Sequence, residues 1–167
     1  MLKWVKKVIW WAWCCVGFVS AIYLAVPAIT DMEWMFVRSR SVYFRIALVE
    51  PFDGELQQGD YVTVQWRGED PQGQGLQDGM MLTKRVICLP GQRLSEDTQF
   101  VGCEDEPQGV VQLTNSKGET VAPFLFDGEV PQDKVYLMGD HPRSYDSRYL
   151  GFFDIEQIQQ KVVWVIS

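Results

Sequence analysis

Several kinds of residue are scarce in this chain, and each shortage excludes a class of function. The 167 residues contain one histidine, His141, and four cysteines without a Cys-x-x-Cys spacing. Zinc sites draw their ligands from such groups, so we expect no metal site, and we also expect no cofactor. Acidic residues are missing from the first 30 positions, where Lys3, Lys6 and Lys7 are the charged side chains.

The remainder of the chain is strongly acidic. The three N-terminal lysines leave 12 basic and 22 acidic side chains for residues 31–167, a net charge of −10. Binding to phosphate backbones needs a basic face, so this balance argues against nucleic acid as a partner. The whole chain is 47% hydrophobic and 22% charged, which indicates a folded body with a core rather than a disordered one.

The absence of charge between residues 8 and 30 predicts a transmembrane helix. Twenty-three helical residues at ~1.5 Å each span roughly 34 Å, enough to cross a bilayer core of about 30 Å. Lysines before the span and none just after it predict a cytoplasmic N-terminus, so residues 1–30 form the anchor and residues 31–167 are exported. The alternative is a cleaved signal peptide, but the apolar cores of those usually run about 7–15 residues.

Residues 31–167 show short apolar runs separated by Gly and Pro. This pattern is typical of a mostly antiparallel β body. Residues 31–40 are expected to be a connector and residues 67–79 a polar loop. The expected strands are 42–49, 61–66, 81–89, 110–114, 121–126, 135–138 and 162–166, with a turn at 139–144 and one helical turn within 154–160.

The sequence TKRVICLPG at residues 83–91 leads a lysine into an apolar strand that Pro90-Gly91 ends. A buried ammonium is costly, so Lys84 either finds a carboxylate partner or loses its proton and becomes a base. A lowering of its pKa from ~10.4 to 7 or 8 would suit general-base catalysis. The plainer alternative is a lysine on an edge strand that discourages aggregation.

Three blocks together resemble a known family. They are SRSVYFRIALV at 39–49, TKRVICLPG at 83–91 and YLMGDHPRSYDSRYLG at 136–151, following one N-terminal span. They resemble the membrane-anchored Ser/Lys peptidases of the type I signal peptidase family, and most of all its branch attached to conjugative transfer systems. The resemblance implies a signal-peptidase-like antiparallel β body with one N-terminal transmembrane helix.

The resemblance also assigns chemical roles residue by residue. Ser41 matches the nucleophile and Lys84 the general base that removes its proton. Ser39 matches the side chain that completes the oxyanion hole with the backbone N–H of Ser41, and Ser144 matches the hydroxyl that orients the lysine. Because Val42-Tyr43-Phe44 departs from the family's usual proline after the serine, Ser39 remains an alternative nucleophile.

Three further assignments concern the surroundings of these residues. Asp146 and Arg148 match a structural ion pair of the family, whereas from the residues alone they would be a solvated loop with a local pair. His141 is an alternative base, although nothing else in the sequence suggests a group to hold its imidazole. An oxidising exterior would let Cys88 and Cys103 form a disulfide, with two free thiols as the alternative.

These expectations define a function. We expect a serine endopeptidase in the bacterial inner membrane, in contact with its lipid, that cleaves exported precursor proteins near the membrane surface. The conjugative branch implies a pilus or transfer-apparatus precursor, and contact with transfer components. An amine could replace water and give peptide transfer or cyclisation. One alternative is a catalytically silent, membrane-anchored scaffold of a transfer or secretion apparatus. Another is a self-cleaving Ser/Lys repressor fold, and this one is disfavoured by the anchor and the acidic body.

Overall fold

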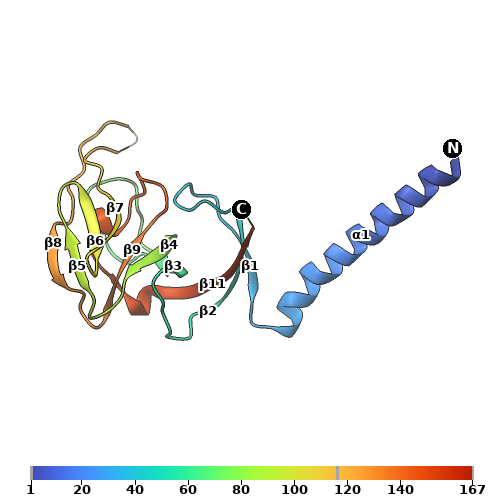
Figure 1. Ribbon diagram of the computed structural model, residues 1–167, viewed down its shortest axis with the longest axis horizontal. Helices are drawn as coiled ribbons and strands as arrows, with labels where there is room; N and C mark the ends of the chain where they lie inside the picture. The colour runs from blue at the N-terminus through green and yellow to red at the C-terminus, as the bar shows by residue number, and fades with distance from the viewer. Residues whose placement is uncertain (1, 116, 167) are drawn as a thin grey trace.

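A long apolar helix and a β body make up the protein, whose computed structural model describes residues 2–115 and 117–166. Helix α1 (Leu2–Ile29) projects away from the body (Figure 1). Its segment Lys6–Val26 is long and apolar enough to cross a membrane, and none of it is buried against the body. The Nε1 of Trp34, just after the helix, donates to the carbonyl of Tyr23 at 3.2 Å, which ties the helix end to the first strand.

The larger sheet has seven strands in the order β1-β2-β11-β3-β4-β9-β10. All its neighbouring strands pair antiparallel. In chain order the strands are β1 (Glu33–Phe36), β2 (Ile46–Pro51), β3 (Tyr61–Gln65), β4 (Met81–Cys88), β9 (Lys134–Met138), β10 (Phe153–Asp154) and β11 (Ile158–Ile166). The last strand returns between β2 and β3, so the sheet closes only when the C-terminal segment is in place.

A second sheet of four antiparallel strands lies at the end of the body far from α1 (Figure 1). Its order is β7-β6-β5-β8, and the strands are β5 (Arg93–Glu96), β6 (Phe100–Cys103), β7 (Glu106–Val110) and β8 (Phe126–Glu129). A disulfide between Cys88 and Cys103, whose Cα atoms are 5.7 Å apart, joins the end of β4 to β6. Both cysteines are fully buried, and they pack in an apolar cluster with Ile87, Leu94 and Tyr136.

The mostly antiparallel β fold with one N-terminal apolar helix is confirmed. The strands expected near 61–66, 81–89 and 135–138 are present, and the expected closing strand 162–166 is the end of the longer β11. The short helical turn within 154–160 is a 3₁₀ turn at Ile155–Gln157.

Several expected boundaries are wrong. Residues 42–45 form a loop before β2. Alternate apolar side chains of this loop are buried as they would be in a strand, which explains the incorrect prediction. The strands expected at 110–114 and 121–126 are displaced to β7 and β8. Strands β1, β5 and β6 and the helix α2 (Ser147–Leu150) are additional elements, and each is four residues long, too short for a clear pattern in the sequence.

Candidate active site

Lys84 lies in the interior of the larger sheet. Strand β4 is flanked by β3 and β9, and Lys84 pairs with Val62 of β3. The side chain is 2% exposed, so the alternative of an edge-strand lysine is wrong. Burial lowers the pKa of Lys84 to about 8, because the charged form loses its water; the nearby carboxylate of Asp146 opposes this shift.

The amine of Lys84 meets a hydroxyl rather than a carboxylate. Its Nζ donates to Oγ of Ser144 at 2.7 Å, and no ion pair with Lys84 occurs among residues 2–115 and 117–166. Ser144 is itself buried, and its backbone N–H donates to the carbonyl of His141 at 2.9 Å. The turn at 139–144 therefore fixes the hydroxyl that the lysine contacts.

Gly139 brings this turn against the segment that carries Ser41. A Cβ at Gly139 would lie 2.3 Å from Oγ of Ser144 and 2.7 Å from the carbonyl oxygen of Ser41. Real side chains do not approach so closely, so glycine is required here by packing. Ser41 and Ser144 are thus neighbours across one glycine, although they are far apart in the sequence.

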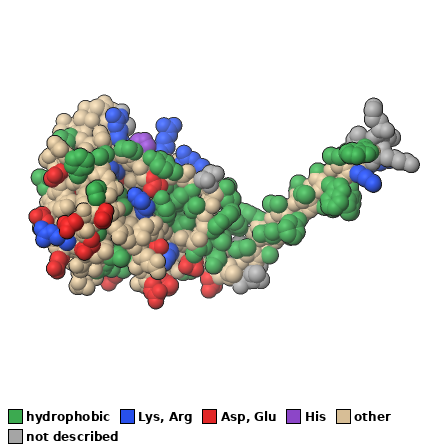
Figure 2. Space-filling view, viewed as in Figure 1, with side chains coloured by type: hydrophobic (Ala, Val, Ile, Leu, Met, Phe, Trp, Pro, Cys, Tyr) green, Lys and Arg blue, Asp and Glu red, His purple; other side chains and the backbone are tan. Residues whose placement is uncertain are grey.

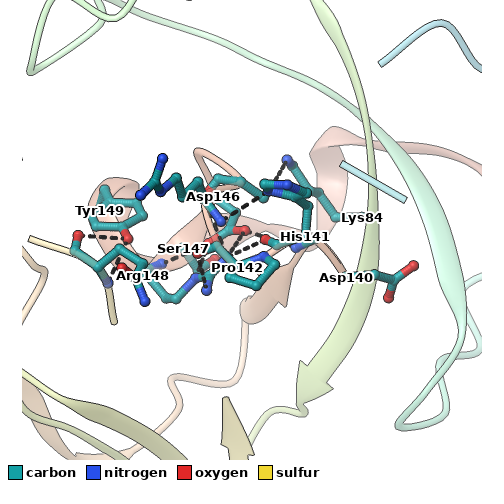
Figure 3. Close-up of polar contacts among 12 residues, drawn as sticks. Lys84, Asp140, His141, Pro142, Asp146, Ser147, Arg148 and Tyr149 are labelled. Carbon is teal, nitrogen blue, oxygen red and sulfur yellow. Dashed lines mark hydrogen bonds and ion pairs between the residues drawn. The ribbon is translucent and has the colours of Figure 1, made fainter. Parts of the chain in front are cut away.

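Asp146 and Arg148 form a buried ion pair beneath the turn (Figure 3). Nε and Nη2 of Arg148 donate to the two carboxylate oxygens at 2.9 and 2.8 Å, which is the bidentate geometry that arginine and carboxylate favour. Both side chains are at most 2% exposed. The alternative of a solvated loop at these residues is wrong.

Arg148 also binds the backbone of the turn. Its guanidinium donates to the carbonyls of Val110, Pro142, His141 and Ser144 at 2.8–3.3 Å. Burial acts to lower the pKa of Arg148, but hydrogen bonds and charge from Asp146 raise it above its usual value. The arginine therefore stays charged, and it holds the turn that carries Ser144.

Ser41 lies in the loop 37–45 between β1 and β2. The loop is closed by a hydrogen bond from the N–H of Val37 to the carbonyl of Arg45 at 2.9 Å. Val42 and Phe44 are buried and anchor the loop in an apolar cluster, while Ser41 remains half-exposed. The carbonyl of Ser41 accepts from the N–H of His141 at 3.2 Å, so the serine loop rests on the turn.

Asp140 is the residue that sequence reasoning missed. Its carboxylate accepts from the N–H of Tyr43 at 3.2 Å and from the hydroxyl of Tyr61 at 2.9 Å, and its Oδ1 lies 3.6 Å from Nε of Arg85. The hydroxyl of Tyr43 also donates to the carbonyl of Asp140. Asp140 therefore locks the serine loop to β3 and β4. The only signal was its place in the Gly-Asp turn, because its partners are up to 97 residues away in sequence.

The remaining predicted residues are less engaged. Ser39 is exposed, and its carbonyl accepts from Arg45 at 2.6 Å. In the described part of the chain, no hydrogen bond is formed by the hydroxyls of Ser39 and Ser41. Nδ1 of His141 accepts from the N–H of Arg143 at 3.1 Å, so the imidazole is held within its own turn rather than against Ser41.

An open cavity of about 410 Å³ is lined by residues of both the serine loop and the turn. They are Arg40, Ser41, His141, Arg143, Ser144 and Tyr145. Within residues 2–115 and 117–166, no group of three or more His, Cys, Asp or Glu side chains is placed to hold a metal ion. The cavity is lined by two serines, Ser41 and Ser144, and the hydroxyl of Ser144 contacts the buried amine of Lys84.

Fold and site together define a mostly antiparallel β protein with an apolar N-terminal helix and a buried lysine–serine contact beside a cavity. Comparison with known families identifies the family to which the chain belongs. The family model described as signal peptidase, peptidase S26 matches residues 2–167. The chain therefore belongs to the signal peptidase S26 family, a family of serine proteases, and the apolar helix of a chain in this family suggests a membrane anchor.

Among solved structures, a crystal structure of a signal peptidase I from Enterococcus faecalis V583 is similar at 23% identity and a TM-score of 0.39. The match covers 68% of this chain and 97% of that one. A search of curated proteins found no match.

Proposed function

We propose that this protein is a membrane-anchored endopeptidase of the signal peptidase I type that uses Ser41 as nucleophile and Lys84 as general base. The observation that carries the proposal is the state of Lys84. In a chain of a serine protease family, a buried lysine contacts a hydroxyl instead of a carboxylate, and its pKa is lowered to about 8. An amine with a pKa of about 8 is uncharged in an appreciable fraction of molecules near physiological pH and can act as a base, whereas an ion-paired lysine stays charged.

The proposed reaction is acyl transfer in two stages. The neutral amine of Lys84 takes the proton of the Ser41 hydroxyl as its oxygen attacks the carbonyl carbon of the scissile peptide bond. The resulting oxyanion accepts hydrogen bonds from the N–H of Ser41 and from the hydroxyl of Ser39. The Lys84 ammonium then gives its proton to the leaving amine, and the first product departs from an ester on Ser41.

Water resolves the ester in the second stage. Lys84, again neutral, takes a proton from the water that attacks the ester carbonyl, and then returns that proton to Oγ of Ser41. The second product leaves with a new carboxyl group. An amine in place of water would give peptide transfer or cyclisation by the same steps. Throughout, Ser144 orients the lysine, and the pair of Asp146 and Arg148 supports the turn.

The proposed substrates are exported precursor proteins, cleaved close to the membrane. Residues 1–30 would be a cytoplasmic N-terminus and inner-membrane anchor, and residues 31–167 the exported peptidase domain. Ser41 lies 11 residues beyond Thr30, so even an extended chain keeps it within ~40 Å of the end of the span. The three blocks quoted above support assignment to the conjugative-transfer branch, and hence a pilus or transfer-apparatus precursor as substrate.

Cleavage of a co-expressed precursor by a set of variants tests this proposal. We expect processing to be lost with Ser41→Ala and with Lys84→Ala, and retained with His141→Ala. Loss with Ser39→Ala, together with activity in Ser41→Ala, would move the nucleophile to Ser39. Thermal unfolding of each purified variant checks that it is folded. Full processing by both Ser41→Ala and Lys84→Ala would leave the anchored scaffold as the better account.

A further inference from the structure

The cavity beside Ser41 has an unusual charge for this protein. Two arginines, Arg40 and Arg143, line it together with Ser41 and Ser144. Both arginine residues are exposed, and in the described part of the chain neither makes an ion pair. The exported body carries a net charge of −10, so two arginines without ion-pair partners at the cavity are opposite in sign to the body as a whole.

Other charged groups near the cavity do not neutralise these arginines. The carboxylate of Asp140 is 9% exposed and accepts from Tyr43 and Tyr61, and the carboxylate of Asp146 is fully buried against Arg148. The serine loop itself adds Arg38 and Arg45, both exposed, and carries no acidic residue between positions 37 and 45. The net accessible charge around the nucleophile is therefore positive.

The surface view agrees with this separation of charge. In Figure 2 Lys and Arg side chains flank the histidine on the upper edge of the body, whereas Asp and Glu side chains gather on its left and lower parts. Such an arrangement attracts an anionic group to one edge and repels it from the others. The guanidinium of arginine presents a planar set of donors that matches the two oxygens of a carboxylate. A diffuse positive field lacks this geometric match.

We propose that Arg40 and Arg143 are specificity-determining residues that bind a carboxylate side chain, Asp or Glu, of the precursor next to its scissile bond. This inference rests on the proposed function and names a property of its substrate. A substrate is favoured over anionic lipid as the occupant because both arginines line the same cavity as Ser41 and Ser144. A peptide bound for cleavage must pass through this cavity.

The test uses three synthetic peptides that share an apolar segment followed by Ala-x-Ala and differ only in a flanking Glu, Gln or Lys. The full chain in neutral detergent, carrying Ser41→Ala, is titrated with each fluorescent peptide. Pairs of exposed charges contribute little individually, so we expect the Glu peptide to bind roughly threefold to tenfold more tightly than the Gln peptide. The Lys peptide should bind more weakly still, and added salt should reduce the differences.

Charge-reversed variants separate recognition from structure. In the same background, Arg143→Glu and Arg40→Glu should each abolish the preference, because one arginine then faces one glutamate, and the double variant should reverse it, so that the Lys peptide binds best. The matched control is Arg93→Gln in the distant four-stranded sheet, where Arg93 is paired with Asp127, and it should keep the preference for Glu. A purely structural role of the arginines would weaken all three peptides equally.

The outcomes distinguish this inference from the proposed function. If the Glu peptide binds preferentially but no peptide is cleaved by the wild type, carboxylate binding by the two arginines stands, and the proposed function fails. If peptides are cleaved without any charge preference, the proposed function stands and the inference is overturned. Equal or absent binding of all three peptides also overturns the inference. So does tight binding of the chain to anionic but not neutral vesicles, if that binding requires Arg40 and Arg143, because it would indicate a lipid site.

Discussion

Two buried basic side chains, Arg148 and Lys84, lie close together in this protein and have opposite kinds of partner. Arg148 is held by both oxygens of a buried carboxylate and stays charged, with a raised pKa. Lys84 has only the hydroxyl of Ser144 as a hydrogen-bond partner in the described chain, and its pKa falls to about 8. The same depth of burial therefore yields a structural support in one case and a candidate base in the other. The partner, more than the burial, decides which.

The largest expected effect comes from removing the carboxylate that separates the two cases. Asp146→Asn keeps the shape of the side chain but leaves Arg148 buried without a counter-charge. Breaking a buried pair in this way costs about 3–5 kcal/mol of the free energy of unfolding. Urea denaturation of the purified full chain measures it.

A double variant serves as the control for this prediction. Asp146→Asn combined with Arg148→Met removes the uncompensated charge, so it should regain part of the lost stability. A loss below about 1 kcal/mol for Asp146→Asn alone would contradict the view that this carboxylate holds Arg148 in its charged form.

The next effect concerns the partner of the lysine. Ser144→Ala leaves the Lys84 amine without the hydroxyl that fixes its position, so kcat should fall roughly 10- to 100-fold with little change in KM. Steady-state cleavage of a precursor peptide measures both constants. The matched control is Ser147→Ala, whose hydroxyl accepts from the backbone of Leu137 at 2.9 Å. That variant should lose stability and keep most of its kcat; equal losses of kcat in the two variants would reduce Ser144 to a packing role.

The smallest expected effect concerns a third buried ionisable group, Glu96, in the four-stranded sheet. It is 5% exposed, one of its oxygens accepts from Tyr136 at 2.7 Å, and the other has no partner in the described chain. Burial raises the pKa of Glu96 from 4.5 to about 7. A raised pKa means that stability is fully present below about pH 4.5 and is lost as the pH rises through about 7.

Comparison with Glu96→Gln isolates this contribution. Between pH 5 and pH 8 the free energy of unfolding of the wild type should fall relative to that of Glu96→Gln, by on the order of 1–3 kcal/mol. Denaturant titrations at several pH values measure the difference. Parallel curves for the two proteins would show that burial does not raise the pKa of Glu96 in the folded state.

The sequence was sufficient for features that depend on local pattern. The apolar run after Lys84 ended at Pro90-Gly91 and identified β4, and the Gly, Asp and Pro residues at 139–142 identified the turn. Uncharged length alone identified the apolar helix. In each case the physical cause, burial of a continuous face or a turn preference, acts on neighbouring residues.

Features that depend on distant contacts were missed or displaced. Residues 42–45 of the loop looked like the start of a strand because Val42 and Phe44 alternate with exposed residues, but the two side chains are buried against Tyr61 and its neighbours rather than in a ladder. The roles of Asp140 and of the carbonyl contacts of Arg148 arise only when segments up to 97 residues apart meet. A buried loop and a buried strand both show apolar residues at alternate positions, so over a few residues this pattern does not distinguish them.

The central claim is that Lys84 is a neutral base in the working enzyme, and the pH dependence of kcat/KM tests it most directly, because this constant reports the ionisation of the free enzyme. Below the pKa of the lysine the rate should rise about tenfold per pH unit, and it should level off near pH 8, the value to which burial lowers the pKa of Lys84. A profile that continues to climb to pH 10 would show that Lys84 keeps the pKa of an ordinary solvated lysine. That result would contradict the contrast with Arg148 on which this account rests.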